Sequence, residues 1–379
     1  LITLYHLIFI VKIKIIMNIC IIGDGLTSLS LAKNLINKKI NVHIYYENGT
    51  AKISPNRTVG ISKSNLDFFR NEIQDISKKN FWKIKKIKIN SEKLKGENLL
   101  KFENNNEDLF YIIKNYKLYR LLREKMLKNR SIKKIKNKNF YEKLIKEKKY
   151  DLIINCISNN YLSKKYFTKK IDKDYHNLAF TTILKHEKTK NNTAVQNFTK
   201  FGPIAFLPIS NSETSVVCSV DTKNKFYANS DILKLINQNN PKYKIKKILS
   251  LNSFKLSLIN LRSYRHKNIL AFGDLLHRIH PLAGQGFNMN IRDIKVLSEI
   301  IQSKIDIGVQ LDSSILNEFE KKTKNKNFLF SNSVDFIYEV FNIDNKTKSN
   351  NFSNILKIIG SNKNLTNYFI KIADKGLNF

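Results

Sequence analysis

Residues 18–28 read Asn-Ile-Cys-Ile-Ile-Gly-Asp-Gly-Leu-Thr-Ser, and a helical pattern runs from Thr27 to Asn37. The apolar run predicts a buried strand, and the leucines after the glycine turn are available for burial on a helix. A second apolar run at residues 41–46 completes a strand–helix–strand unit. Such a unit is typical of a parallel α/β sheet.

The turn between this strand and its helix has the spacing of a dinucleotide-binding fingerprint. Gly23 permits a tight turn, and Gly25 lets a pyrophosphate approach the backbone where the helix begins. Ser28 replaces the third glycine of the fingerprint with a small side chain. Glu47 follows the second strand, about 20 residues on, where an acidic residue binds ribose hydroxyls. The turn therefore predicts a dinucleotide site, and an ordinary glycine turn is the alternative.

The parallel pattern is interrupted and later resumed. Residues 151–156 and 268–272 are apolar runs that predict strands buried on both faces. Between them, residues 175–258 alternate apolar and polar side chains between turn signals, which predicts an antiparallel sheet. From about residue 294 the pattern is helical with polar interruptions. We therefore expect an α/β protein with an inserted antiparallel sheet and a helical C-terminal tail.

The charge of the chain is strongly positive. Its 379 residues contain 67 Lys+Arg and 31 Asp+Glu, a formal net charge of +36. The lysines are spread along the chain among Asn and Ile, as an AT-rich genome would produce, so we expect most of them on solvated faces. Attraction to an anionic membrane surface is the functional alternative. Nucleic-acid binding is the least favoured interpretation, because no recognition motif accompanies the charge.

The cysteines and the first residues of the chain indicate the cellular compartment of the protein. Cys20, Cys156 and Cys218 lie far apart without a Cys-x-x-Cys spacing, which indicates reduced thiols in a cytoplasmic protein and no metal site. Residues 1–16 are too short and too interrupted for a spanning helix, and they lack the features of a signal peptide. We expect Met17 to be the true start. A short anchor on a membrane surface is the alternative.

The most informative segment is residues 273–288, which read Gly-Asp-Leu-Leu-His-Arg-Ile-His-Pro-Leu-Ala-Gly-Gln-Gly-Phe-Asn. Asp274 follows a predicted buried strand, at the edge where open α/β sheets bind ligands. The glycines of the loop let backbone amides approach a ligand before the next helix begins. We expect His277 and His280 to shape this loop by hydrogen bonding. No additional carboxylate–histidine cluster supports a metal site.

This segment resembles the second flavin motif of the group A flavoprotein monooxygenases, and its form is closest to that of the ubiquinone-biosynthesis hydroxylases. The resemblance implies that Asp274 binds a ribityl hydroxyl of FAD and that the loop packs against the isoalloxazine ring. No acid–base residue is assigned, because the cofactor carries the difficult chemistry. The cofactor-binding residues expected from the fingerprint and the resemblance are Gly23, Gly25, Ser28, Glu47, Arg57, Asp274, Pro281, Gly284, Gln285, Gly286 and Asn288.

The resemblance extends along nearly the whole chain from Met17. Residues 56–62 resemble the family's Arg-Thr-Ile-Ala-Leu-Ser segment, whose arginine lies near the flavin and corresponds to Arg57. Residues 202–208 resemble its Gly-Pro-Leu-Ala-Leu-Leu-Pro run. The implied organisation is a Rossmann-like FAD-binding domain at 17–174 and 263–300, an antiparallel substrate domain at 175–262, a helical region at 301–379 and a leader at 1–16.

The chain also departs from the family pattern. Ile157 and Ser158 stand where the family has an Asp-Gly pair that helps to hold FAD and NAD(P)H. This substitution concerns the reductive half-reaction, in which NAD(P)H reduces the flavin. In the closest register Tyr46, rather than Glu47, occupies the position of the ribose-binding acid. The other substituted positions are Lys164 or Lys165 for an arginine, Tyr116 or Lys117 for a helix-start arginine, and Asn290 for a glycine.

The resemblance implies hydroxylation of the aromatic ring of a polyprenylated phenol in ubiquinone biosynthesis, with FAD, NAD(P)H and oxygen. Because such a substrate lies in a membrane, we expect a cytoplasmic protein peripheral on the inner membrane, with a biosynthetic complex as partner and no nucleic acid. Two alternatives stay open. One is a flavin-dependent prenyl reductase, and the other is a non-catalytic paralogue that acts as a partner in the complex.

Overall fold

The computed structural model describes residues 17–46, 54–92, 98–103, 108–127, 132–134, 140–223, 227–241, 243–309, 311–346, 360 and 362–377. The leader expected at residues 1–16 lies outside these ranges, and so does Glu47.

The strand–helix–strand unit forms as predicted. β1 (Asn18–Ile22) leads into α2 (Leu26–Asn37), and β2 (Asn41–Tyr46) pairs with β1 in parallel. Residues 19–22 of β1 have no exposed surface. Burial of both faces of the strand explains its unbroken apolar run.

A six-stranded sheet is built on this unit, in the order β16-β17-β9-β1-β2-β8. β9 (Leu152–Asn155) pairs in parallel with β1 on one side and with β17 (Ile269–Ala271) on the other. β8 (Ile132–Lys134) and β16 (Arg265–His266) form its edges. The chain therefore leaves this sheet after β9 and returns to it at β17, which confirms the predicted interruption.

Most of the intervening chain forms a larger sheet, in the order β18-β15-β10-β13-β12-β11-β5-β6, with β14 paired to β10. Neighbouring strands are antiparallel except β5 and β11, which run in parallel. The strands are β5 (Lys86–Ser91), β6 (Asn98–Glu103), β10 (Lys170–His186), β11 (Thr193–Thr199), β12 (Gly202–Pro208), β13 (Glu213–Asp221), β14 (Ile245–Ile248), β15 (Asn252–Leu261) and β18 (His277–Arg278). The antiparallel sheet is thus present, and it also takes in β5 and β6 from the first third of the chain.

A three-stranded sheet lies at the junction between these two. It consists of β3 (Thr58–Ser62), β7 (Phe110–Lys114) and β4 (Trp82–Ile84), with β7 in the middle. The Thr58 hydroxyl donates to the Ser215 hydroxyl at 3.0 Å and so joins β3 to the larger sheet.

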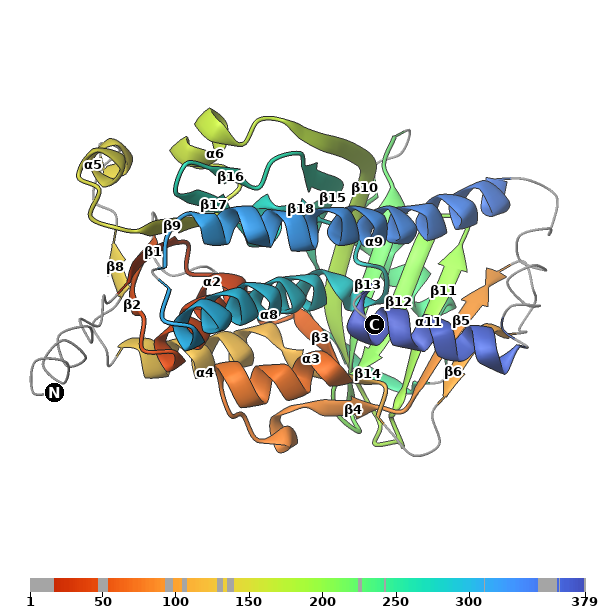
Figure 1. Ribbon diagram of the computed structural model, residues 1–379. Helices are drawn as coiled ribbons and strands as arrows, with labels where there is room; N and C mark the ends of the chain where they lie inside the picture. Colours follow the sequence, from red (N-terminus) through yellow and green to blue (C-terminus); the bar gives the residue numbers. More distant parts are fainter. Residues whose placement is uncertain are drawn as a thin grey trace, which may run out of the picture.

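The longer helices cover the parallel sheet and one face of the larger sheet (Figure 1). α4 (Asn115–Leu127) and α8 (Gln285–Asp306) pack against α2. α9 (Ser314–Lys346) runs beside α8 and continues across the larger sheet, where α11 (Lys363–Lys375) also lies. The C-terminal region is therefore helical, as predicted. The shorter helices are α3 (Lys63–Phe68), its π-helical continuation (Phe69–Ile73), α5 (Phe140–Lys146), α6 (Tyr161–Tyr166) and α7 (Asn229–Gln238).

The apolar core is divided among the layers. The largest cluster surrounds the parallel sheet, between its strands and helices α2, α4 and α8. A second cluster lies between the larger sheet and α9, and it contains Leu256, Leu282 and a stacked pair formed by Phe198 and Phe341. A third fills the space between the opposite face of that sheet and α7.

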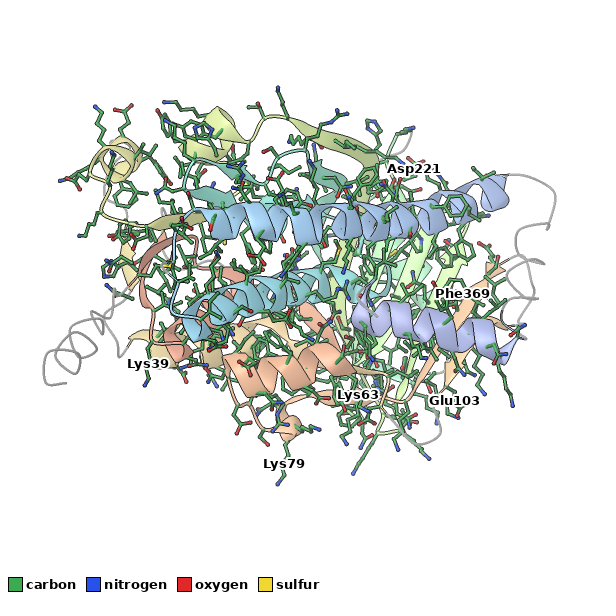
Figure 2. All side chains as sticks on the ribbon, viewed as in Figure 1. Lys39, Lys63, Lys79, Glu103, Asp221 and Phe369 are labelled. Carbon is green, nitrogen blue, oxygen red and sulfur yellow. The ribbon has the colours of Figure 1, made fainter. Side chains whose placement is uncertain are left out.

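The positive charge is distributed over separate parts of the surface. Lys39 follows α2 and Lys79 precedes β4; both are exposed, and Figure 2 shows them at different places on the molecule. Among the helices that the structure describes, none has the length and apolar character needed to cross a membrane.

Candidate functional site

The turn after β1 has the backbone that a phosphate-binding turn requires. Gly23 has a φ of 124°, and a Cβ atom there would lie 2.9 Å from the Ser28 hydroxyl oxygen. Gly25 is the N-cap of α2 and is exposed, with no atom within 4 Å of the position of a Cβ. No side chain caps α2, so the amides of its first turn are available to an anionic group.

Ser28, at the third position of the fingerprint, is buried beneath this turn. Its hydroxyl forms a hydrogen bond with the thiol of Cys156, which follows β9. Burial raises the pKa of Cys156 to about 12, so the thiol is neutral at physiological pH. The serine is therefore accommodated by a hydrogen bond to the neighbouring strand end.

The second motif lies directly against the first. A Cβ at Gly273 would be 3.2 Å from the methyl carbon of Thr27 in α2. The Asn290 side-chain amide donates to the Thr27 hydroxyl at 2.9 Å, so the residue that replaces a family glycine joins α8 to the start of α2. Asp274, next to Gly273, is exposed beside this junction.

The segment from Pro281 to Gly286 contains the loop before α8 and the first residues of that helix. Gly284 is the N-cap in the left-handed conformation, with a φ of 63°, which favours glycine. Gly286 is exposed, with open space where a Cβ would be. α8 has neither a side-chain cap nor an acidic residue in its first turn. Gln285 is buried, and its side-chain oxygen has no hydrogen-bond partner within the described part of the chain.

The Asn288 side chain holds this loop in place through hydrogen bonds. Its side chain is fully buried, and its amide nitrogen donates to the carbonyl oxygens of Gly60 and Gly284, each at 3.1 Å. Its amide oxygen accepts from the backbone nitrogen of Ser62 at 2.9 Å and from the side chain of Asn65 at 3.1 Å. The structure thus places Asn288 behind the loop, where it holds α8 to β3.

Arg57 lies where the three-stranded sheet meets the larger one. Its exposed guanidinium is 4.8 Å from the centre of the Phe254 ring of β15. The neighbouring Asn56 side chain donates to the carbonyl of Ser250 at 2.7 Å and fixes the start of β3. Glu47, which is predicted to bind the cofactor as Arg57 is, lies outside the described residues.

Phe110 of β7 is a residue of this region that the motifs did not reveal. A Cβ at Gly60 would fall 1.9 Å from a carbon of the Phe110 ring, so the ring lies over the glycine. The same ring is 3.6 Å from the Cβ position of Gly284. Phe110 therefore packs between the Arg57 segment and the loop of α8. The glycine in place of the family's alanine at position 60 was the available signal.

Arg123 of α4 is a second such residue. The Tyr119 hydroxyl donates to the Asp24 carboxylate in the first glycine turn at 3.3 Å, and the Arg123 guanidinium is 5.7 Å from the Tyr119 ring. Burial, followed by the charge of Asp24, raises the pKa of Tyr119 to about 12. Arg123 follows Tyr119 by one helical turn, so both side chains lie on the face toward the first glycine turn.

The loop after β9 contains the altered Asp-Gly position. A side-chain carbon of Ile157 lies 3.4 Å from the Cβ position of Gly23. Asn155 and Asn160 bond through their side chains at 2.8 Å, and Asn160 accepts from the backbone nitrogen of Ser163 at 2.9 Å. The loop is therefore well ordered by polar contacts, and it offers an apolar side chain to the glycine turn where the family has a carboxylate.

The two histidines of the second motif differ. His277 is buried and bonds the Asp293 carboxylate at 2.6 Å, as expected of a residue that shapes the loop. His280 is 1% exposed, and neither ring nitrogen has a hydrogen-bond partner within the described residues, so the expectation of hydrogen bonding is wrong for it. It stacks on Tyr338 with ring centres 4.3 Å apart. Burial lowers the pKa of His280 to about 3, so it is neutral.

The arrangement fits an elongated dinucleotide. α2 and α8 begin without side-chain caps, at Gly25 and Gly284, and the hydrogen bond from Asn290 to Thr27 joins the second turn of α8 to the start of α2. Exposed glycines leave room above both ends, and the Asp274 carboxylate lies at the junction. Such ends favour phosphate and other electron-rich groups, so the described residues fit FAD. Within the described chain, no group of three His, Cys, Asp or Glu side chains could hold a metal ion.

Known proteins that resemble this chain are monooxygenases and hydroxylases. The squalene epoxidase family model matches residues 180–368. A mitochondrial ubiquinone biosynthesis monooxygenase of Caenorhabditis elegans is 26% identical over 211 residues, 45% of this chain and 47% of the relative. A 3-demethoxyubiquinol 3-hydroxylase of Escherichia coli is 26% identical over 168 residues, 41% of each chain. The matches thus span less than half the length of these relatives.

Solved structures share the fold over nearly the whole chain. HpxO of Klebsiella pneumoniae, crystallised with FAD and uric acid, has a TM-score of 0.73 at 12% identity and covers 95% of this chain and 97% of its own. The p-nitrophenol 4-monooxygenase of Pseudomonas putida has a TM-score of 0.72 at 12% identity, with coverages of 96% and 99%. The chain is therefore similar in sequence to ubiquinone-biosynthesis hydroxylases, and it shares the fold of solved flavin-dependent monooxygenases.

Proposed function

We propose that this protein is an FAD-dependent monooxygenase that hydroxylates the aromatic ring of a polyprenylated phenol in ubiquinone biosynthesis. The observation that carries the proposal is the packing of two helices without side-chain N-caps, α2 and α8, which the hydrogen bond from Asn290 to Thr27 joins. FAD bound there would accept electrons from NAD(P)H and activate oxygen for the hydroxylation.

Different residues of the chain would hold different parts of the cofactor. The backbone amides at Gly25 receive the pyrophosphate, and Arg123, which lies near Asp24 through Tyr119, adds positive charge at the same turn. The Asp274 carboxylate accepts a hydrogen bond from a ribityl hydroxyl. The backbone amides at the start of α8, after Gly284, would stabilise negative charge on a flavin ring bound beside them.

The aromatic substrate would bind between the flavin loop and the larger sheet. Arg57 and Phe254 lie at that boundary, and the apolar cluster under α9, with Leu256 and Leu282, adjoins it. Apolar side chains of this kind suit a prenylated ring and exclude water from the reacting atoms. Contact with a membrane surface and with other biosynthetic proteins belongs to this proposal, because the substrate class requires delivery from lipid.

The visible absorption spectrum of the purified protein tests the proposal. We expect the full chain, purified and desalted without added cofactor, to keep an oxidised-flavin spectrum and to release FAD on denaturation. Anaerobic addition of NADPH or NADH should then bleach the flavin band. A colourless protein that does not take up FAD would contradict the proposal.

One observation favours a second candidate, a non-catalytic paralogue that acts as a partner in the complex. Ile157 presents an apolar side chain to the Gly23 turn in place of a carboxylate. The variant Ile157→Asp/Ser158→Gly separates the two. Because polar contacts between Asn155 and Asn160 already order this loop, we expect FAD affinity to change by less than about tenfold. A larger gain would indicate a decayed site and favour the paralogue.

A further inference from the structure

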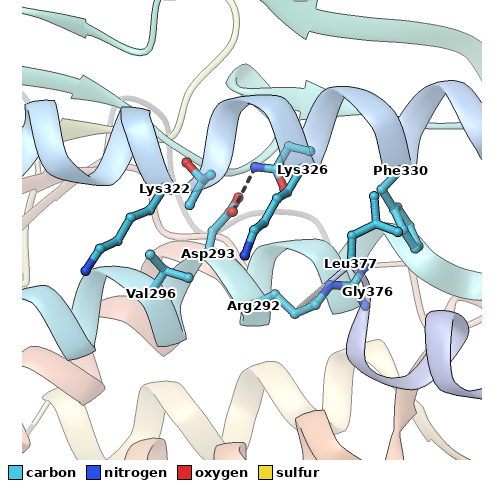
Figure 3. Close-up of a pocket in the computed structure, with 10 residues that line it drawn as sticks. Arg292, Asp293, Val296, Lys322, Lys326, Phe330, Gly376 and Leu377 are labelled. Carbon is cyan, nitrogen blue, oxygen red and sulfur yellow. Dashed lines mark hydrogen bonds between the residues drawn. The ribbon is translucent and has the colours of Figure 1, made fainter. Parts of the chain in front are cut away.

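A small cavity lies between α8, α9 and the end of α11, and Figure 3 shows the side chains around it. Its volume is about 20 Å³, enough for one water-sized group, and it opens toward solvent. Val296 and Phe330 form apolar walls, and Gly376 and Leu377 close the α11 side. The cavity begins about 10 Å along α8 from Gln285, so it is separate from the flavin loop.

Arg292 is the unusual group in this cavity. Its side chain is 8% exposed, and its two terminal nitrogens have no hydrogen-bond acceptor in the described part of the chain. The Phe330 ring lies 4.5 Å from the guanidinium, and a Cβ at Gly376 would be 2.8 Å from its Nε atom. Burial lowers the pKa of Arg292 to about 10, so it stays charged at neutral pH. A buried cation without an acceptor is costly, which points to an anionic ligand.

The nearby carboxylates are already engaged. Asp293, which also lines the cavity, accepts from His277 at 2.6 Å and from Asn327 at 2.9 Å. Asp374 attracts Arg292 through its charge, and one of its oxygens accepts from the backbone nitrogen of Ser64 at 2.8 Å. Neither carboxylate forms a hydrogen bond with Arg292 within the described residues.

Two lysines add positive charge at the mouth. Lys322 and Lys326 lie one turn apart on α9, and both line the cavity. Figure 3 shows Lys326 extending from α9 toward α8, near Asp293 and Arg292. Lys322 also pairs with Glu318 at 2.8 Å on the exposed side of the helix. The lining therefore contains three cationic side chains and one carboxylate.

We propose that this cavity binds one phosphate group. The guanidinium of Arg292 supplies two neighbouring N–H donors, which match two oxygens of an oxyanion. The small volume beside Arg292 holds one oxygen, so the rest of the group stays at the mouth, which Lys322 and Lys326 line. The phosphate comes either free from solution or on the headgroup of an anionic lipid, since both present the same oxygens.

Thermal unfolding of the full chain in sodium phosphate tests the proposal, with sodium chloride of equal ionic strength as reference. We expect phosphate to raise the melting temperature of the wild type with a saturable dependence on concentration. Arg292→Gln should abolish this rise. Lys322→Ala/Lys326→Ala should weaken the apparent affinity about tenfold.

The matched control is Lys295→Ala/Lys321→Ala, which removes two exposed lysines of the same helices outside the cavity. It should keep the wild-type affinity, because general attraction to the positive surface would be lost equally in both double variants. If Arg292→Gln does not fold, the two lysine pairs decide the question. Equal phosphate affinity in both pairs would overturn the site.

A second arm distinguishes the source of the phosphate. Co-sedimentation with vesicles of phosphatidylcholine containing phosphatidic acid is compared with vesicles of phosphatidylcholine alone. Binding that needs phosphatidic acid and falls in Lys322→Ala/Lys326→Ala, but not in the control pair, assigns the phosphate to a lipid. Saturable stabilisation by inorganic phosphate without such vesicle binding assigns it to a soluble ligand. Failure of both arms rejects the proposal.

Discussion

Gly60 and Phe110 fit together so closely that each restricts the other. A Cβ at position 60 would fall 1.9 Å from the Phe110 ring, which also packs near Gly284. We expect Gly60→Ala to lower the free energy of unfolding by about 1–3 kcal/mol, because the ring must move from a packed position. Urea unfolding measures this.

The double variant Gly60→Ala/Phe110→Leu is the control for this clash. A smaller side chain at position 110 should recover most of the loss. If Gly60→Ala is as stable as the wild type, the ring does not hold this place in solution.

His280 makes the stability of the folded protein depend on pH. Burial lowers its pKa to about 3, below the ordinary value near 6.5, so the unfolded state binds a proton more readily than the folded state. This contribution to stability is complete above pH 6.5 and is lost as the pH falls toward 3. We expect a loss of about 2 kcal/mol between pH 7.5 and 5, measured by urea unfolding. His280→Gln should flatten this dependence, and an unchanged slope in that variant would show that another group causes it.

At the scale of elements, α8 depends on one buried amide. Asn288 links the helix start to Gly60 and Ser62 of β3. We expect Asn288→Leu to lower the free energy of unfolding by about 3 kcal/mol, because buried backbone groups of β3 and of the loop lose their partners. Differential scanning calorimetry should show the shift.

An exposed asparagine in a helix provides the comparison. Asn325→Leu on α9 should change stability by less than about 0.5 kcal/mol. Similar losses in the two variants would mean that Asn288 is not a special contact.

The elements that follow from local pattern were predictable, and those that depend on distant partners were not. β1, α2 and β2 are encoded by an apolar run, a glycine turn and a helical pattern, and they form within one residue of the expected bounds. The parallel pairing of β5 with β11 was missed, because no local pattern specifies a partner so far along the chain. The glycine turns of the site were likewise readable, whereas the approach of Phe110 and Arg123 depends on β7 and α4 packing against them.

At the scale of the whole molecule, the net charge of +36 opposes compaction through self-repulsion. Salt screens charges over about 10 Å at 0.1 M, so we expect the melting temperature to rise with sodium chloride concentration. The rise should continue without saturation between about 0.05 and 0.5 M, unlike the saturable effect expected of phosphate. A melting temperature that does not respond to sodium chloride would show that the lysines are too well solvated to repel one another.

The return of the chain to its first sheet has a consequence for biosynthesis on the ribosome. β9 pairs with β1 along one edge and with β17 along the other. β17 is translated only after every strand from β10 to β15. Until then the nascent chain carries an apolar strand with one unpaired edge, a template for association with other chains. Pairing across so long an intervening segment also slows folding. A ribosome stalled before residue 269 would therefore hold a segment that chaperones bind, and translation past β17 would release it.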